Sequence, residues 1–372
     1  MSNSITKKNR LGQIALSMTA LLLIMSPAKA AAERVVNVFS WADYVDPKVV
    51  KNFEKETGIK VVFDTYDSAS TVEAKLATGA SGYDVVNTDE LTSERLARIG
   101  QLKELDRSKI PNWKNLDPAI LRIMALSDPG NKYNAPLYHG TFGIMYNVDK
   151  VKAVDPSVTF ESFASLLDPA VIGKFAKCGV NLYDGNMEHY GMYQITKGKS
   201  GNIKTPDQIK ESEEAFMKIR PFIRKIDAAD YVNAMATSEI CVTTAFSGDY
   251  LFAMNKAAGS GVKLNLKFVM PKEGGQSWTD GWIIPKTSVN QAEAHAFINY
   301  MLEAKNAAAN TNFTNYPNGV LTAKPFVKKE LLDNPAVYFP TEKLAKMETY
   351  FEMPPGIGKL MTKSWNRFKS GR

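Results

Sequence analysis

Strand-like and helix-like segments alternate over the first third of the chain, and this order restricts the possible fold more than any other feature. The strand-like segments are short apolar runs at 35–39, 60–63 and 84–86. Helical patterns occupy 47–57, 71–78 and 93–99, each followed by a glycine. Because strands joined by a helix run parallel with a right-handed crossover, the βαβαβ order predicts a parallel sheet covered by helices.

A second α/β segment is expected after the glycine-containing stretch 138–143, which suits a crossing or hinge between domains. Its predicted elements are, in order, a strand at 178–182, a helix opened by the capping box of Thr205 and Gln208, a strand at 241–246 and a helix from Asp249. Later in the chain we expect a helix capped by Asn290 and a helical tail from Thr341. No internal repeat is evident in this sequence.

The N-terminus has the pattern of a secretory signal peptide. Basic residues within 7–10 precede an apolar run at 11–25, and small residues at 28–30 suit cleavage. The alternative is an uncleaved membrane anchor, but the run is shorter than the ~20 residues of a spanning helix and contains polar side chains. No cysteine lies near the cleavage site, which argues against a lipid anchor. The sequence therefore predicts a periplasmic protein.

The remaining chain of about 340 residues exceeds what a single core usually holds, so we expect two α/β lobes. The predicted division is a signal peptide at 1–30, lobe 1 at 31–140 plus 255–303, and lobe 2 at 141–254 plus 304–372.

The net charge limits the classes of molecule that the protein is expected to bind, and the cysteine content bears on the compartment in which it works. The formal net charge of +7 falls to about +3 without the signal, which carries four basic residues and no acid. Because Lys and Arg are spread along the chain without blocks, nucleic-acid binding is not indicated. The two cysteines, Cys178 and Cys241, are expected to form a disulfide in an oxidising compartment, worth about 4 kcal/mol on the chain-entropy account.

Aromatic and acidic side chains gather where the predicted strands end, which is where α/β sheets bind ligands. The clusters are Trp41, Asp43 and Tyr44; Asp89 and Glu90; Tyr183, Asp184 and Glu188; Phe246, Asp249 and Tyr250; and Trp278 with Asp280. Carboxylates beside aromatic faces suit an organic cation. Each cluster also has an ordinary explanation, since acids cap helices and aromatic rings fill cores.

Motifs for catalysis are missing from the sequence. His139, His189 and His295 lack the spacing of a zinc site and are expected to be packing or surface residues. No P-loop, dinucleotide fingerprint, nucleophile elbow or CxxC occurs. We therefore expect no metal, no cofactor and no enzymatic activity, with glycoside hydrolysis by paired carboxylates as the open enzymatic alternative.

Several ordered stretches of the chain match a known family. They are Phe53–Val62, Trp113–Pro118, Gly143–Val151, Cys178–Val180 and Lys369–Gly371. In these stretches the chain resembles the periplasmic polyamine-binding proteins of ABC transporters, the putrescine and spermidine receptors. The resemblance implies a two-lobed periplasmic binding protein fold of type II, in which each lobe is a mostly parallel sheet flanked by helices and a hinge joins the lobes.

The resemblance also implies a ligand site, an aromatic box with acids at its ends. Its members in this sequence would be Trp41, Asp43, Tyr44, Glu188, Phe246, Asp249, Trp278, Asp280 and Tyr316. Asp89 is added to this set, at a position where putrescine receptors commonly have serine. The chain departs from the family pattern in Ala42, Phe246 and the pair Tyr138-His139 as well.

The sequence thus predicts a monomeric periplasmic protein that binds a putrescine- or spermidine-class polyamine and delivers it, by hinge closure, to an inner-membrane ABC permease. Two alternatives stay open: a receptor for another cationic solute such as agmatine or a basic amino acid, and a periplasmic enzyme acting on a small substrate. The extra acid at Asp89 is expected to favour a ligand with another amine or a different pose.

Overall fold

The structure is a computed structural model that describes residues 33–66, 69–79, 81–339, 343, 346–354 and 356–371. The predicted signal peptide lies outside the described residues. Arg34–Arg372 packs together as one unit. Within the described ranges no helix combines the length and the apolar character that crossing a membrane requires.

The first three strands form the predicted parallel arrangement. The strands are β1 (Val35–Trp41), β2 (Lys60–Tyr66) and β3 (Val85–Asp89), and the helices that follow them are α1 (Pro47–Thr57), α2 (Ala69–Ala77) and α3 (Glu90–Arg98). β1 lies between β2 and β3 and runs parallel to both. Gly58, at φ 66°, ends α1 in the left-handed conformation that glycine adopts without strain. The predicted βαβαβ unit is therefore confirmed.

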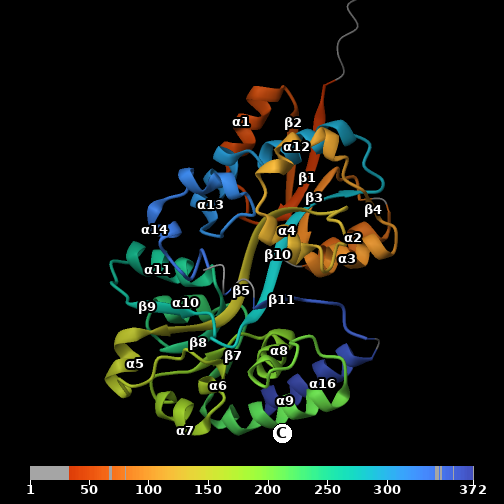
Figure 1. Cartoon of the computed structure of the whole chain (residues 1–372). Coiled ribbons are helices and arrows are strands. Elements are labelled where there is room, and N and C mark those ends of the chain that lie inside the picture. Colours follow the sequence, from red (N-terminus) through yellow and green to blue (C-terminus); the bar gives the residue numbers. More distant parts are fainter. Residues whose placement is uncertain are drawn as a thin grey trace, which may run out of the picture. The chain divides into compact units, whose positions relative to one another are not determined.

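Two long strands continue the sheet beyond β3 (Figure 1). They are β5 (Ala135–Asn147) and β10 (Gly275–Pro285). β10 pairs antiparallel with β3 and with β5, and β5 pairs antiparallel with β8 and β9. The expectation of mostly parallel strands is therefore wrong for this half of the sheet, because β5 and β10 pair directly and not through helical crossovers.

The other strands are short. They are β4 (Leu102–Lys103), β6 (Asn181–Leu182), β7 (Lys225–Ile226), β8 (Val242–Phe246), β9 (Leu266–Val269) and β11 (Met347–Thr349). β6 and β7 form a separate parallel pair, and the others join the main sheet.

Helices cover the sheet along its length (Figure 1). The α-helices after α3 are α4 (Pro118–Met124), α5 (Val148–Val154), α6 (Phe163–Leu166), α7 (Pro169–Ile172), α8 (Asn186–Thr196), α9 (Pro206–Ile219), α10 (Tyr231–Ala236), α11 (Asp249–Gly259), α12 (Gln291–Met301), α13 (Ala304–Thr314), α14 (Lys329–Leu332) and α16 (Ile357–Ser370). Short 3-10 turns are η1 (Arg107–Lys109), η2 (Pro111–Asn115), η3 (Gly173–Phe175), η4 (Arg220–Phe222) and η5 (Leu321–Phe326).

Two large hydrophobic cores share the strand β5. Leu137 and Tyr138 are buried in the first core together with side chains of β1, α1 and α12. Phe142 and Ile144, further along the same strand, are buried in the second core with side chains of α8, α9 and α16. β5 therefore passes from one core into the other, as expected of a two-lobed molecule.

The predicted lobe boundaries stay a prediction, but the packing of one segment differs from them. Side chains of α13, η5 and α14 are buried in the first core, whereas the prediction assigned 304–372 to lobe 2. The cause is α13, whose Ala307 and Ala308 pack among first-core residues. Only the end of this segment, α16, is buried in the second core.

Local signals in the second half are confirmed in part. Thr205 and Gln208 form the predicted capping box of α9, and α11 begins at Asp249 as predicted. Asn290 occupies the cap position of α12 but makes no side-chain cap bond, because its amide donates to Asp84 Oδ2 at 3.0 Å. Cys178 and Cys241 form the predicted disulfide.

The prediction of a helical tail from Thr341, a residue that itself lies outside the described ranges, is wrong for Met347–Thr349. Residues Met347–Thr349 form β11, which pairs in parallel with Gly275–Ser277 of β10, and the helix α16 begins at Ile357. Pairing with an existing strand overrides a local helical pattern here.

Candidate ligand-binding site

A cavity of about 450 Å³ collects most of the predicted site residues. Its lining is Trp41, Tyr44, Asp89, Glu90, Leu91, Met187, Glu188, Phe246, Trp278, Asp280, Tyr316 and Tyr350. These side chains come from β1 and the turn after it, from β3, α3, α8, β8 and β10, and from the segments after α13 and β11. Eight of the ten predicted residues therefore meet in one place, and two, Asp43 and Asp249, are not among the lining residues. The volume is in the range of about 300–1,000 Å³ that is usual for small-molecule sites.

Four aromatic rings form a continuous wall of this cavity. Phe246 and Trp278 have ring centroids 6.4 Å apart at an interplanar angle of 87°. Trp278 meets Tyr316 edge-on at 5.3 Å, and Tyr316 lies 5.8 Å from Tyr44. Edge-to-face packing of this kind holds each ring in a defined orientation. The wall is therefore preformed.

Two glycines make room for the wall. A Cβ atom on Gly140 of β5 would lie 2.4 Å from Trp278 Cζ2 across the β5–β10 ladder. A Cβ atom on Gly248 would lie 1.9 Å from Tyr316 Cε1. Gly140, predicted to serve a crossing segment or hinge, has a direct steric role, because the indole occupies the space of its missing side chain.

Asp280 is the most buried of the predicted acids that line the cavity, at 6 % exposure. Tyr44 Oη donates a hydrogen bond of 2.5 Å to Asp280 Oδ2. Burial raises the pKa of Asp280 to about 7; the hydrogen bond from Tyr44 opposes this shift and the nearby charge of Asp89 adds to it. A cation bound beside Asp280 would stabilise its ionised form.

Asp89 lies opposite Asp280 on the neighbouring strand, since the two are paired across the β3–β10 ladder. Its carboxylate accepts hydrogen bonds from Thr92 N at 2.9 Å and Thr92 Oγ1 at 2.8 Å, so Asp89 caps α3. The ordinary explanation, helix capping, is therefore confirmed for Asp89. The same residue also lines the cavity.

Glu188 lies in the first turn of α8 and is partly buried. Burial raises the pKa of Glu188, and the nearby Asp184 shifts it in the same direction. It approaches the cavity from the elements of the second core, whereas Tyr44 and Asp89 approach from those of the first.

Asp249 stands behind the aromatic wall. Its Oδ2 accepts hydrogen bonds from Tyr231 Oη and, at 3.0 Å, from the backbone N of Phe246. Burial raises its pKa to about 6, and hydrogen bonds from Tyr231, Phe246 and Tyr316 oppose the shift. Asp249 thus fixes the backbone position from which Phe246 enters the cavity.

Asp43 is exposed, in a left-handed backbone conformation at φ 56° in the turn after β1. It is not among the residues that line the cavity. Its role as a partner of an amine stays a prediction.

Sequence reasoning missed four lining residues: Glu90, Leu91, Met187 and Tyr350. Glu90 directly follows Asp89 in the cluster already noted at the end of a strand, which was a usable signal. Tyr350 could not be found in this way, because the strand β11 that carries it to β10 was expected to be a helix.

The three histidines are packing residues, as predicted. His189 Nε2 lies 2.9 Å from Thr244 Oγ1, and His295 Nε2 accepts a hydrogen bond of 3.0 Å from Asp106 N. His139 is buried in β5, and burial lowers its pKa to about 4. Across the described residues, no group of three or more His, Cys, Asp or Glu side chains could hold a metal ion.

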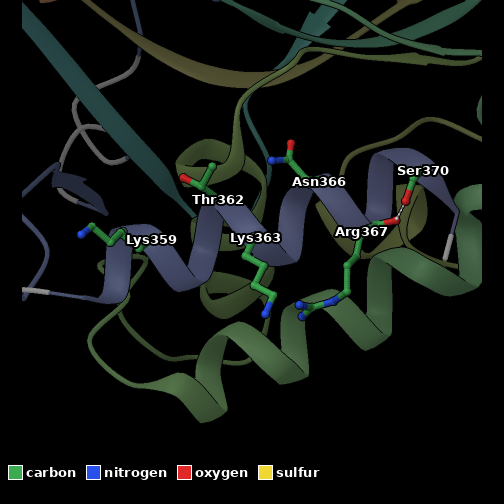
Figure 2. A pocket seen from close by; sticks show the side chains of 7 residues that line it. Lys359, Thr362, Lys363, Asn366, Arg367 and Ser370 are labelled. Carbon is green, nitrogen blue, oxygen red and sulfur yellow. Dashed lines mark hydrogen bonds between the residues drawn. The ribbon is translucent and has the colours of Figure 1, made fainter.

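A second hollow, of about 660 Å³, lies along the outer face of α16 (Figure 2). It is lined by Gly358, Lys359, Thr362, Lys363, Asn366, Arg367 and Ser370. Figure 2 shows Lys363 and Arg367 extending toward the neighbouring helix α9, where Arg367 Nε donates to Glu213 Oε1 at 2.6 Å. This basic face would repel a cation, so the acidic cavity is the candidate site.

The fold and the cavity define a class: an α/β protein with two cores, of the two-lobed type II periplasmic binding protein fold, that holds a small solute between elements of both cores. Residues 48–338 match the sequence profile of the bacterial extracellular solute-binding proteins. The chain belongs to this family.

Relatives and solved structures agree with this assignment. The chain is 36% identical over 364 residues to the putrescine-binding periplasmic protein SpuD of Pseudomonas aeruginosa, covering 98% of this chain and 99% of the relative. It is 36% identical over 355 residues to the putrescine-binding periplasmic protein PotF of Escherichia coli, covering 95% and 96%. The crystal structure of the spermidine/putrescine ABC transporter substrate-binding protein PotD of Streptococcus pneumoniae superposes with a TM-score of 0.81 at 30% identity, covering 91% of this chain and 99% of that one. The resemblance predicted from the sequence is confirmed.

Proposed function

We propose that this protein captures a polyamine cation in the periplasm and delivers it to an inner-membrane ABC permease. The observation that carries the proposal is the composition of the cavity: Asp89, Glu90, Glu188 and Asp280 line it together with an aromatic wall, and none of its described lining residues is Lys, Arg or His. The names of the relatives, which are putrescine- and spermidine-binding proteins, support the same ligand class.

The chemistry of the cavity fits an alkyl ammonium. An ammonium that leaves water needs charge-assisted hydrogen bonds, which Asp280 and Glu188 supply. The faces of Trp41, Trp278 and Tyr316 add cation–π attraction and apolar contact for the methylene chain. A basic amino acid suits the cavity less well, because its carboxylate would meet acids without a basic partner.

The origin of the cavity-lining residues indicates that the protein captures its ligand by closing the two lobes around it. Tyr44 and Asp89 belong to elements of the first core, and Glu188 and Phe246 to elements of the second. A ligand that bonds to both sets stabilises the closed arrangement by its binding to both, as expected of a hinge transition. We further propose that the protein acts as a monomer, has no enzymatic step and enters the periplasm through the signal peptide at 1–30.

A ligand screen tests the proposal. Purified protein is heated with putrescine, cadaverine, spermidine, agmatine or lysine, and we expect an amine at one hundred times its Kd to stabilise the fold by about 2.7 kcal/mol. Absence of a shift with every amine would refute the proposal. Recovery of a chemically altered amine would favour an enzyme.

A pair of variants connects binding to the cavity. Asp280→Asn keeps the size of the side chain and removes its charge, and we expect a loss of roughly 1 to 3 kcal/mol of polyamine affinity by calorimetry. Asp333→Asn, at the C-cap of α14 where the side chain is 60% exposed, is the matched control and should bind like the unaltered protein. Equal affinity of all three proteins would remove Asp280 from the site.

A further inference from the structure

Two buried polar atoms in the cavity lack a partner. Glu90 is 4 % exposed and Tyr350 is 5 % exposed. Glu90 Oε2 accepts a hydrogen bond of 2.8 Å from Thr279 N, but Glu90 Oε1 and Tyr350 Oη have no hydrogen-bond partner among the described residues. A buried polar atom without a partner is costly, and both atoms belong to residues that line the cavity. Atoms of this kind are available to form hydrogen bonds with a bound ligand.

The two residues lie along the same edge of β10, the edge that faces away from β5. Glu90 opens α3, directly after β3, which pairs with one part of β10. Tyr350 follows β11, which pairs with another part of β10 through Ser277 and Thr349. The charges of Glu188 and Glu90 both act on the phenol of Tyr350. Tyr350 is therefore near both acids.

The carboxyl groups that line the cavity outnumber the ammonium groups of a diamine. Four carboxyl groups line it, those of Asp89, Glu90, Glu188 and Asp280. Asp89 is the best satisfied of them, since it caps α3 through two hydrogen bonds. The other three include Glu90, whose pKa is raised by burial first and then by the charge of Asp89. A diamine provides two positive charges, which leaves one of these three groups without a cation.

We propose that Glu90 and Tyr350 form a third cation-recognition position, so that the preferred ligand is a linear triamine rather than a diamine. The proposal rests on the polyamine function above and specifies the ligand of that same site. A secondary ammonium in the middle of a chain has two N–H donors: one bonds to Glu90 Oε1 and the other to Tyr350 Oη. The primary ammonium groups at the two ends are left for Asp280 and Glu188.

Calorimetry with two ligands tests this. Putrescine and spermidine are titrated into the unaltered protein, and we expect spermidine to bind about tenfold or more tightly, the effect of one added charge-assisted hydrogen bond. Putrescine binding as tightly as spermidine, or more tightly, would overturn the proposal. If neither amine binds, the polyamine function itself fails and this inference falls with it.

Two variants test whether Glu90 and Tyr350 cause the preference for spermidine over putrescine. In Glu90→Gln an amide oxygen still accepts from Thr279 N, so the fold is kept while the charge is lost. We expect spermidine affinity to fall about tenfold or more and putrescine affinity by less than about threefold. Tyr350→Phe should lower the spermidine-to-putrescine ratio in the same direction. Glu104→Gln, at a surface position where the side chain is 60% exposed, is the control.

The ratio of the two affinities separates recognition from structural damage. A variant that merely disturbs the fold weakens both ligands equally, and that result, or an unchanged ratio in Glu90→Gln, would overturn the role of Glu90. Agmatine serves as a third ligand, since a guanidinium concentrates its donors at one end of the molecule. Tighter binding of agmatine than of spermidine would also overturn the proposal.

Discussion

The carboxyl group of Asp280 is held between opposing influences. Burial and the cross-strand Asp89 favour its neutral form, while the hydroxyl of Tyr44 favours the carboxylate. The arrangement is poorly satisfied without a cation and well satisfied with one. The affinity of this site for a cation therefore depends on the protonation state of Asp280 as well as on the contact area.

We predict that polyamine affinity falls as the pH is lowered from about 7 to 5. Since the pKa of Asp280 is about 7, the ligand must displace a proton below that pH, which costs up to about tenfold in affinity per pH unit. Calorimetry across this range measures the slope, and Asp280→Asn should bind more weakly with a shallower slope. An equal slope in the variant would contradict this account.

The stability of the unliganded protein should show the matching trend. The pKa of Asp280 is raised on folding, so between pH 4 and 7 the folded chain holds a proton that the unfolded chain releases. This contribution to stability is complete below about pH 4 and is lost as the pH rises to about 7. Denaturant unfolding at several pH values should show it, with a smaller change in Asp280→Asn.

At the scale of the elements, the β5–β10 pair positions the aromatic wall. Trp278 on β10 lies opposite Gly140 on β5, and the strand continues to Asp280 two residues later. The residue paired with Trp278 on the neighbouring strand thus determines whether the indole has room at this position. This explains why a glycine stands at position 140 of the buried strand β5.

We predict that Gly140→Ala weakens polyamine binding and destabilises the fold by about 1–3 kcal/mol, the cost of overpacking. The new Cβ would lie 2.4 Å from Trp278, so the indole must move. Gly259→Ala is the control: Gly259 ends the helix α11 with no atom within 4 Å of the added Cβ, and it should be neutral or slightly stabilising. Thermal unfolding and calorimetry compare the two, and equal behaviour would contradict the steric argument.

Local elements were predicted well where the signal is local. Asp46 and Gly58 mark the ends of α1, and Thr205 with Gln208 opens α9, because each acts within a few residues of its position. The pairing of β11 with β10 joins residues far apart in the sequence, and no local pattern encodes it. Tyr350 was missed for this reason.

The candidate site was predicted mainly from strand ends and family resemblance. Eight predicted residues line one cavity, whereas Asp43 is exposed because the turn after β1 places it there. The sequence places Glu90 beside Asp89 in an acidic cluster but does not single it out as a lining residue, because the depth of its burial follows from packing against Thr279 of a distant strand. Whether a residue lines the cavity depends on its burial and on the register between paired strands, and neither can be derived from one sequence.

At the scale of the whole molecule, the disulfide links two parts of the chain that are distant in sequence. Cys178 and Cys241 are 63 residues apart in sequence, and the segment between them contains α8, α9 and α10. Joining them restricts the unfolded chain far more than the folded one.

We predict that reduction lowers the free energy of unfolding by about 4 kcal/mol or less, the chain-entropy value for a loop of this length. Denaturant unfolding with and without reductant measures the change. The double variant Cys178→Ser with Cys241→Ser should resemble the reduced protein and be insensitive to reductant. A reductant effect of equal size in that variant would contradict the assignment.

The two indole side chains that line the cavity have a further consequence for experiments. Of the five tryptophans in the chain, Trp41 and Trp278 line the cavity, and the indole nitrogen of each has no hydrogen-bond partner among the described residues. Exchange of water for an ammonium beside an indole alters the polarity around the excited ring. The intensity and colour of the protein's own ultraviolet emission should therefore report occupancy directly, so that capture and release can be followed in real time without an attached dye.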